Sequence, residues 1–228
     1  MNCPKCGSDQ KVKSGIVKSR QRFKCNVCGC NYTVEIKSTA KPNFMKKDAL
    51  HLYLEGLGFR SIGRFLGVSN VSVLKWIRSF GNQVSSLHAE SKEIEVVELD
   101  EMHSYIGSKK NYCWIWIAVD RYGKKFINFV IGDRSNETAE EFWDKINHHK
   151  MATITSDYWK AYESIVPKEK HIQSKSETFT VEGYNSLFRH FLARMRRKSK
   201  CYSKKIEMLR LSVLLLMHYR NNSLYILS

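Results

Sequence analysis

The sequence predicts an α/β fold in which helices flank a mixed sheet and two small modules precede it. Paired cysteines within the first 30 residues, an apolar helical pattern around a glycine turn, and alternating apolar runs from residue 93 predict these three parts. We expect them at residues 1–37, 44–82 and 93–228. A chain of 228 residues with 43% hydrophobic side chains is long enough to bury a core.

Charge is distributed unevenly along the chain. The net charge is +16 at pH 7, which indicates nucleic acid or an anionic membrane as a partner. Residues 1–82 carry +11, residues 83–183 carry −4 and residues 184–228 carry +9. An acidic centre between basic ends is typical of a metal-dependent active site flanked by DNA-binding surfaces. Two solvated basic faces are the alternative.

Nothing in the sequence indicates export or membrane insertion. No signal peptide is recognisable at the N-terminus. The most apolar run, 209–217, contains Arg210 and is shorter than the roughly 20 residues that cross a bilayer. We expect a soluble protein of the cytoplasm that associates with the nucleoid and has no membrane partner.

The first module carries a zinc-binding pattern. Cys3-x-x-Cys6 and Cys25-x-x-Cys28 are separated by 18 residues, a spacing typical of a structural Zn²⁺ site closed by four thiolates. Disulfides in a secreted module are the alternative. Cys30 is a second choice for the fourth ligand, with a poorer spacing.

A hairpin is expected between the two cysteine pairs. Residues 11–24 alternate loosely and contain a turn at Gly15. Two cysteine knuckles joined by a hairpin make a zinc ribbon, and the lysines and arginines of this hairpin suit contact with phosphates.

The sequence of the second module predicts a helix-turn-helix. After a helix over 44–55, an apolar face of Ile62, Phe65 and Leu66 ends at a glycine turn, and Ser69 is placed to cap the next helix. The alternative is a helical hairpin that only packs. If the module binds DNA, the side chains that face the major groove are Asn70, Ser72, Lys75 and Arg78.

The third part alternates strands and helices. The order βββαβαβα is typical of an RNase H-like sheet, and a final apolar helix packs on the sheet or on another subunit. The expected strands are 94–106, 112–120, 125–132, 152–156 and 170–174. The expected helices are 138–147, 159–165, 181–197 and 203–220.

Three carboxylates fall where such a sheet would bring them together. Asp100 lies in the first strand, Asp157 ends the fourth, and Glu182 lies at the start of the long helix. The two strands are neighbours in this topology. Carboxylates suit Mg²⁺ or Mn²⁺, and two such ions stabilise both the attacking and the leaving oxygen of a phosphodiester.

Other acidic residues compete for the same roles. Glu98 shares a strand face with the first carboxylate because side chains alternate along a strand, whereas Glu101 is expected to point away. Glu177 competes with Glu182 but precedes the helix. Asp120 and Asp133 sit beside turns, so we interpret them as turn residues.

Basic and amide side chains follow the third carboxylate. Asn185 and Arg189 share its helical face and are placed to orient a scissile phosphate. A basic run continues beyond them, for which DNA-backbone contact is preferred over a solvated face. The members of this run assigned to DNA are Arg194, Arg196, Arg197 and Lys198.

Several motifs together resemble one family. They are Leu99–Gly107, Ala118–Arg121, Thr155–Asp157, Val181–Asn185 and Phe191–Ser199, with 24 residues between the second and third carboxylates. In these motifs, and in the modules ahead of them, the chain resembles the DDE transposases of the insertion sequence 1 family over essentially its whole length.

The resemblance implies a DNA transposase. The zinc ribbon and helix-turn-helix would bind terminal inverted repeats, and the carboxylate triad would hold two Mg²⁺ or Mn²⁺ ions. Cleavage would free a 3′-OH that attacks target DNA, within a homo-oligomer that joins two element ends. The alternatives are an RNase H-like nuclease that cuts without joining, and a non-enzymatic repressor that only binds DNA.

Overall fold

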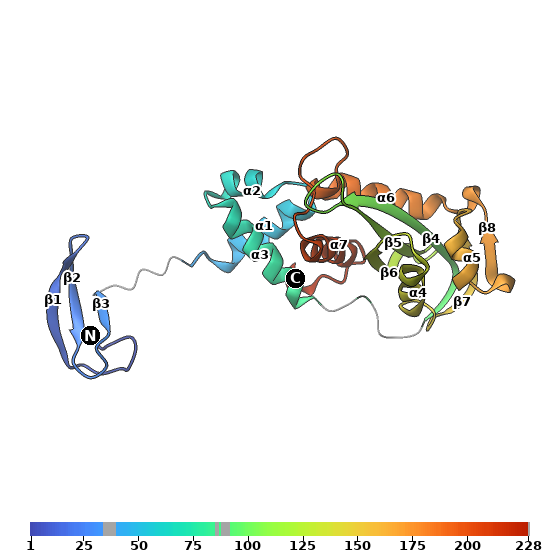
Figure 1. Ribbon diagram of the computed structural model, residues 1–228. Coiled ribbons are helices and arrows are strands. Elements are labelled where there is room, and N and C mark those ends of the chain that lie inside the picture. The colour runs from blue at the N-terminus through green and yellow to red at the C-terminus, as the bar shows by residue number, and fades with distance from the viewer. Residues whose placement is uncertain (34–39, 85–86, 88–91, 228) are drawn as a thin grey trace. The chain divides into compact units, whose positions relative to one another are not determined.

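Two separate β-sheets organise the chain, one in Met1–Pro42 and one in Asn43–Ser228, and each belongs to its own compact unit. The computed structural model describes residues 1–33, 40–84, 87 and 92–227 (Figure 1). Among the described residues, every helix is too short or too polar to cross a bilayer.

The first unit is an antiparallel sheet of β1 (Lys11–Val17), β2 (Arg20–Cys25) and β3 (Asn31–Thr33). The hairpin between the cysteine pairs is therefore present. Its turn is not at Gly15, as we predicted, but at Lys18 and Ser19, which both have positive φ. Gly15 instead has a φ of 84° beside a register shift within β1, where a bulge uses the left-handed conformation of glycine.

The second unit begins with three helices, α1 (Asn43–Leu54), α2 (Phe59–Leu66) and α3 (Asn70–Gln83). Gly67 ends α2 with a φ of 64°, and Ser69 caps α3 by accepting a 3.0 Å hydrogen bond from the Ser72 N–H. Both features match the expected turn. Phe65 does not, because it is 74% exposed while Ile62 and Gly63 form the buried side of α2.

The larger sheet has five strands in the order β6-β5-β4-β7-β8. β5 is antiparallel to β4 and to β6, whereas β7 is parallel to β4 and to β8. The predicted order of strands and helices is confirmed. The strands are β4 (Glu93–Tyr105), β5 (Tyr112–Asp120), β6 (Lys125–Gly132), β7 (Lys150–Ser156) and β8 (His171–Gln173).

Helices cover both faces of this sheet. They are α4 (Asn136–Asp144), α5 (Lys160–Ile165), α6 (Phe179–Phe191) and α7 (Ile206–Arg220). Alternate side chains of β4 and β5 enter two separate cores, one with α4 and α5 and the other with α6, α7 and the three N-terminal helices. The final helix therefore packs on the sheet, as expected, and also on α1 and α3.

The long helix after β8 is shorter than we predicted. It ends at Phe191 rather than near residue 197, because Leu192 is extended and residues 193–195 form a buried 3₁₀ turn. Arg194, in that turn, is 8% exposed and donates to the Tyr53 hydroxyl at 2.7 Å and to Ser203 Oγ at 2.6 Å. Its assignment to DNA was wrong, since this guanidinium ties α1 to the C-terminal segment.

Candidate active site and cysteine cluster

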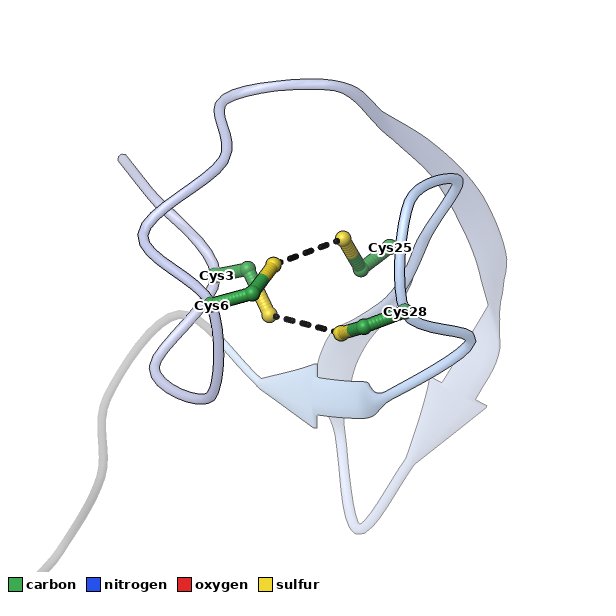
Figure 2. A group of neighbouring side chains, drawn as sticks. All are labelled: Cys3, Cys6, Cys25 and Cys28. Carbon is green, nitrogen blue, oxygen red and sulfur yellow. Dashed lines mark hydrogen bonds between the residues drawn. The ribbon is translucent and has the colours of Figure 1, made fainter.

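Four cysteine sulfurs meet at one end of the first unit (Figure 2). Cys3 lies 3.6 Å from Cys28, and Cys6 lies 3.6 Å from Cys25, measured between Sγ atoms. All four sulfurs are within 4.8 Å of one another. Cys30 is outside this cluster, so the structure favours Cys28 over it.

This geometry fits a tetrahedral zinc ion and not disulfides. A disulfide requires about 2.05 Å between sulfurs, whereas tetrahedral Zn–S bonds of 2.3 Å place sulfurs about 3.8 Å apart. Gly7 and Gly29 follow the two pairs with φ of 75° and 69°, and their N–H groups donate to the carbonyls of Cys3 and Cys25.

A second cluster, of carboxylates, lies where β7 ends and β4 continues. The last residue pair between these strands is Glu98 with Thr155. Beyond it, Asp100 on β4 and Asp157 after β7 line one cavity of about 350 Å³ together with Glu182 from the first turn of α6. The backbone N–H of Trp159 donates to Asp157 Oδ1 at 3.0 Å and holds that carboxylate in place.

Glu101, rather than Glu182, is the third member of the close carboxylate cluster. Oxygens of Asp100, Glu101 and Asp157 lie within 4.8 Å of one another, so our expectation that Glu101 points away was wrong. Its buried carboxylate accepts a hydrogen bond from the Tyr162 hydroxyl at 2.8 Å and forms an ion pair with Arg134. These two partners come from α5 and from the loop after β6, and no strand periodicity signals them.

The cluster fits a divalent metal ion. Carboxylate and amide oxygens are the ligands that Mg²⁺ and Mn²⁺ prefer. Asn185 donates from Nδ2 to Asp100 Oδ2 at 2.5 Å. Its Oδ1 is buried and accepts no hydrogen bond from any residue that the structure describes. An orphaned oxygen beside the carboxylates is a candidate ligand for an ion or for its water.

The electrostatics of the cluster favour binding of a cation. Burial raises the pKa of Asp100 to about 7, and the charges of Glu101 and Asp157 add to the rise, while the hydrogen bond from Asn185 opposes it. Without a cation, Asp100 therefore holds a proton up to about neutral pH. A bound cation offsets that rise, because its positive charge stabilises the ionised carboxylate.

Metal affinity should depend on pH as a consequence. Below pH 7 the ion must displace the Asp100 proton, so we expect Mn²⁺ affinity to fall by roughly tenfold per pH unit on acidification and to level off above pH 8. Calorimetric titration in buffers of different ionisation enthalpy should detect about one proton released per site at pH 6 and almost none at pH 8.5. An affinity that stays flat from pH 6 to 8 contradicts this.

Glu98 and Glu177, the competing candidates, are engaged elsewhere. Arg121 donates to Glu98 Oε1 at 2.6 Å, to Glu177 Oε2 at 2.9 Å and to the Glu177 carbonyl at 2.6 Å. Glu98 is fully buried, and its other oxygen accepts the Val181 N–H at 2.8 Å. This group, which we name the Arg121 clamp, fixes the start of α6 to β4.

The other competing carboxylates belong to turns, as predicted. Asp120 accepts from the Gly123 N–H at 2.8 Å, and Asp133 accepts from the Ser135 N–H at 3.0 Å. Neither lines the carboxylate cavity.

The predicted DNA contacts are distributed over several surfaces. On α3, Asn70, Lys75 and Arg78 are exposed and Ser72 is half-buried, with its hydroxyl 2.9 Å from Ser69 Oγ. Near the carboxylates, Asn185 is buried and Arg189 is half-buried. The exposed members of the basic run are Arg196, Arg197 and Lys198.

Comparisons with known proteins agree on one family. Residues 94–225 match a family described as IS1 transposase. The insertion element iso-IS1n protein InsB of Shigella dysenteriae is 33% identical over 112 residues, which are 49% of this chain and 86% of that protein. The insertion element IS1 4 protein InsB of Escherichia coli is 32% identical over 124 residues, 54% of this chain and 74% of that protein.

A solved structure is also similar, but too distantly to support any conclusion. It is a chain in the cryo-EM structure of the simian T-cell lymphotropic virus intasome, with 15% sequence identity and a TM-score of 0.34. The similarity covers 75% of this chain and 66% of that chain.

Proposed function

Because this chain belongs to the IS1 transposase family, we propose that it cuts DNA at the ends of an insertion element and joins those ends to target DNA. One observation carries the proposal. Asp100, Asp157 and Glu182, far apart in sequence, line a single cavity in a chain of net charge +16. Phosphodiester chemistry on a polyanion needs both the carboxylates and the surrounding positive charge.

We assign different functions to the larger sheet and to the N-terminal modules. We propose that the five-stranded sheet is RNase H-like. The zinc ribbon and the α2–α3 helix-turn-helix would bind the terminal inverted repeats, with Asn70, Lys75 and Arg78 at the groove. Two element ends must meet for joining, so we expect a homo-oligomer.

Asp100, Asp157 and Glu182 are the residues that would hold two Mg²⁺ or Mn²⁺ ions. When bound, such ions neutralise charge on a phosphodiester and lower the pKa of a coordinated water or 3′-OH. Neighbouring residues hold these carboxylates in position. Asn185 orients the Asp100 carboxylate, and the Arg121 clamp holds Glu182 at the cavity by fixing the first turn of α6. Arg189, half-buried on the same helix, would supply a fixed positive charge to the phosphate.

The product made from element-end DNA tests this function. Purified protein, Mg²⁺ and labelled end DNA should give strands covalently joined to target DNA. Cut ends without joined products would identify a nuclease of the same fold. Bound DNA with neither product, whether the metal is Mg²⁺ or Mn²⁺, would identify a repressor.

Zinc should be required for binding to element ends. Cys6→Ser removes one sulfur of the cluster, so we expect the first unit to lose its fold and affinity for end DNA to fall by at least about tenfold, because structural zinc supplies folding energy. Fluorescence anisotropy with labelled ends measures it. The matched control is Cys201→Ser, since Cys201 is also an exposed cysteine but lies outside the cluster. Unchanged affinity for Cys6→Ser would refute a structural zinc.

A further inference from the structure

A row of aromatic rings extends from the carboxylate cluster along β4 and β5. His103 pairs with Trp114, and Tyr105 pairs with Tyr112, across the two strands. The ring centroids are 5.5 Å apart in the first pair and 4.9 Å in the second, and His103 lies 5.8 Å from Tyr112. We name these four residues the aromatic face.

The aromatic face is open to solvent while the opposite face of the same strands is core. Tyr112 is 61% exposed, His103 is exposed, and Tyr105 and Trp114 are half-buried. The alternate residues Met102, Ser104, Cys113 and Ile115 are buried. β7 pairs with β4 only as far as Glu98, so the aromatic face lies on the part of β4 that extends past the end of β7.

Arg134 connects this face to the carboxylates. Its guanidinium lies 4.1 Å from the ring centroid of Trp114 and 3.8 Å from that of Trp159, and it forms the ion pair with Glu101. Glu101 in turn shares the cluster with Asp100 and Asp157. A ligand on the aromatic face is therefore adjacent to whatever occupies the carboxylate cavity.

The surroundings of the aromatic face are positive. Residues 102–119 contain Lys109 and Lys110 and no Asp or Glu. Burial lowers the pKa of His103, and the positive charges of Arg189 and Arg197 lower it further. Among the residues that the structure describes, no carboxylate forms an ion pair with either arginine. Cations beside exposed rings are complementary to a nucleic acid backbone and its bases.

We propose that the aromatic face binds unpaired nucleotides of the DNA strand next to the phosphate that is cut. This inference rests on the proposed function and adds a substrate feature to it, a locally single-stranded end. A duplex backbone requires only charge, whereas exposed rings bind bases whose faces are free to stack. A cross-strand ladder that only stabilises the hairpin is the competing explanation, and it predicts no effect on DNA binding.

The test compares two DNA probes by fluorescence anisotropy. One is an element-end duplex, and the other is the same duplex with a short single-stranded extension of thymidines. Binding is measured for the full chain without added divalent metal, so that no strand is cut. We expect the wild type to prefer the extended probe and Tyr112→Ala to lose about tenfold in affinity for that probe alone. Tyr112→Phe, which keeps the ring, should retain the preference.

Tyr122→Ala is the matched control. Tyr122 is also 61% exposed but lies in the turn at the other end of β5, so its loss should change neither affinity. Thermal unfolding of each variant confirms that the fold is intact. Equal losses on both probes, no loss on either, or a loss of self-association without a change in DNA binding would overturn the proposal.

The outcome of this binding test can be distinguished from the outcome of the DNA-joining test of the proposed function. Suppose that Tyr112→Ala loses the preference while the wild type forms no joined product with Mg²⁺. Nucleotide binding by the aromatic face is then supported, and the transposase function is refuted. If the wild type joins ends and Tyr112→Ala binds both probes normally, the transposase function is supported and nucleotide binding by the aromatic face is refuted. A wild type without preference for the extended probe also overturns the aromatic face.

Discussion

Asp157→Asn should lower the rate of strand cleavage and joining by about 10³-fold or more. The substitution keeps the size of the side chain but removes a negative charge from a cluster in which carboxylate oxygens lie within 4.8 Å of one another. The ions that carry the chemistry would then be bound too weakly to act. Affinity for end DNA should stay unchanged, because we assign most of it to the N-terminal modules. Gel quantification of cut and joined strands measures the effect.

The matched control for this variant is Asp144→Asn. Asp144 is an exposed carboxylate on α4 and does not line the carboxylate cavity. Its replacement should leave the rate within about twofold of the wild type, as expected for a surface position. Equal rates for Asp157→Asn and the wild type would remove Asp157 from the active site.

Arg121→Ala should destabilise the larger unit strongly. The change leaves Glu98, which is fully buried, without its counter-charge, and such a loss costs about 3–5 kcal/mol. For a unit of this size the thermal midpoint should fall by roughly 10 °C. The start of α6 also loses its attachment to β4, so cleavage should decrease further than end-DNA binding in the fraction that stays folded.

Arg210→Ala is the control for the effect of Arg121→Ala on thermal stability. Arg210 also pairs with a glutamate, Glu207, but both side chains are about half exposed. Exposed pairs contribute about 1 kcal/mol or less, so the midpoint should barely move. If the two arginine variants unfold at the same temperature, the Arg121 clamp does not hold the helix.

Periodicity explains why most of the larger unit could be predicted. Runs 112–120 and 125–132 alternate or are continuously apolar, and the bounds predicted for these two strands match the structure. The N-cap at Ser69 and the turn at Gly67 are equally local signals. The cysteine pairs predicted their own cluster, because metal ligands follow a spacing rule that needs no knowledge of the rest of the fold.

Errors occurred where tertiary contacts override local pattern. Arg194 belongs to a basic run that we assigned to DNA contact, yet it is buried against Tyr53 and Ser203, from segments that local sequence cannot bring together. Glu101 alternates away from Asp100 along β4, but Arg134 and Tyr162 hold its carboxylate at the cluster. Arg121 gave no periodic signal, because it lies in a turn.

We propose that the carboxylate cavity is a metal site that carries the DNA chemistry. The most direct measurement is the joining rate of Asp157→Cys with Mg²⁺ and with Mn²⁺. A thiolate is a poor ligand for Mg²⁺ and a better one for softer ions, so we predict joined products with Mn²⁺ and essentially none with Mg²⁺. Equal rates with the two metals, or no product with either from folded protein that binds end DNA, would contradict the claim.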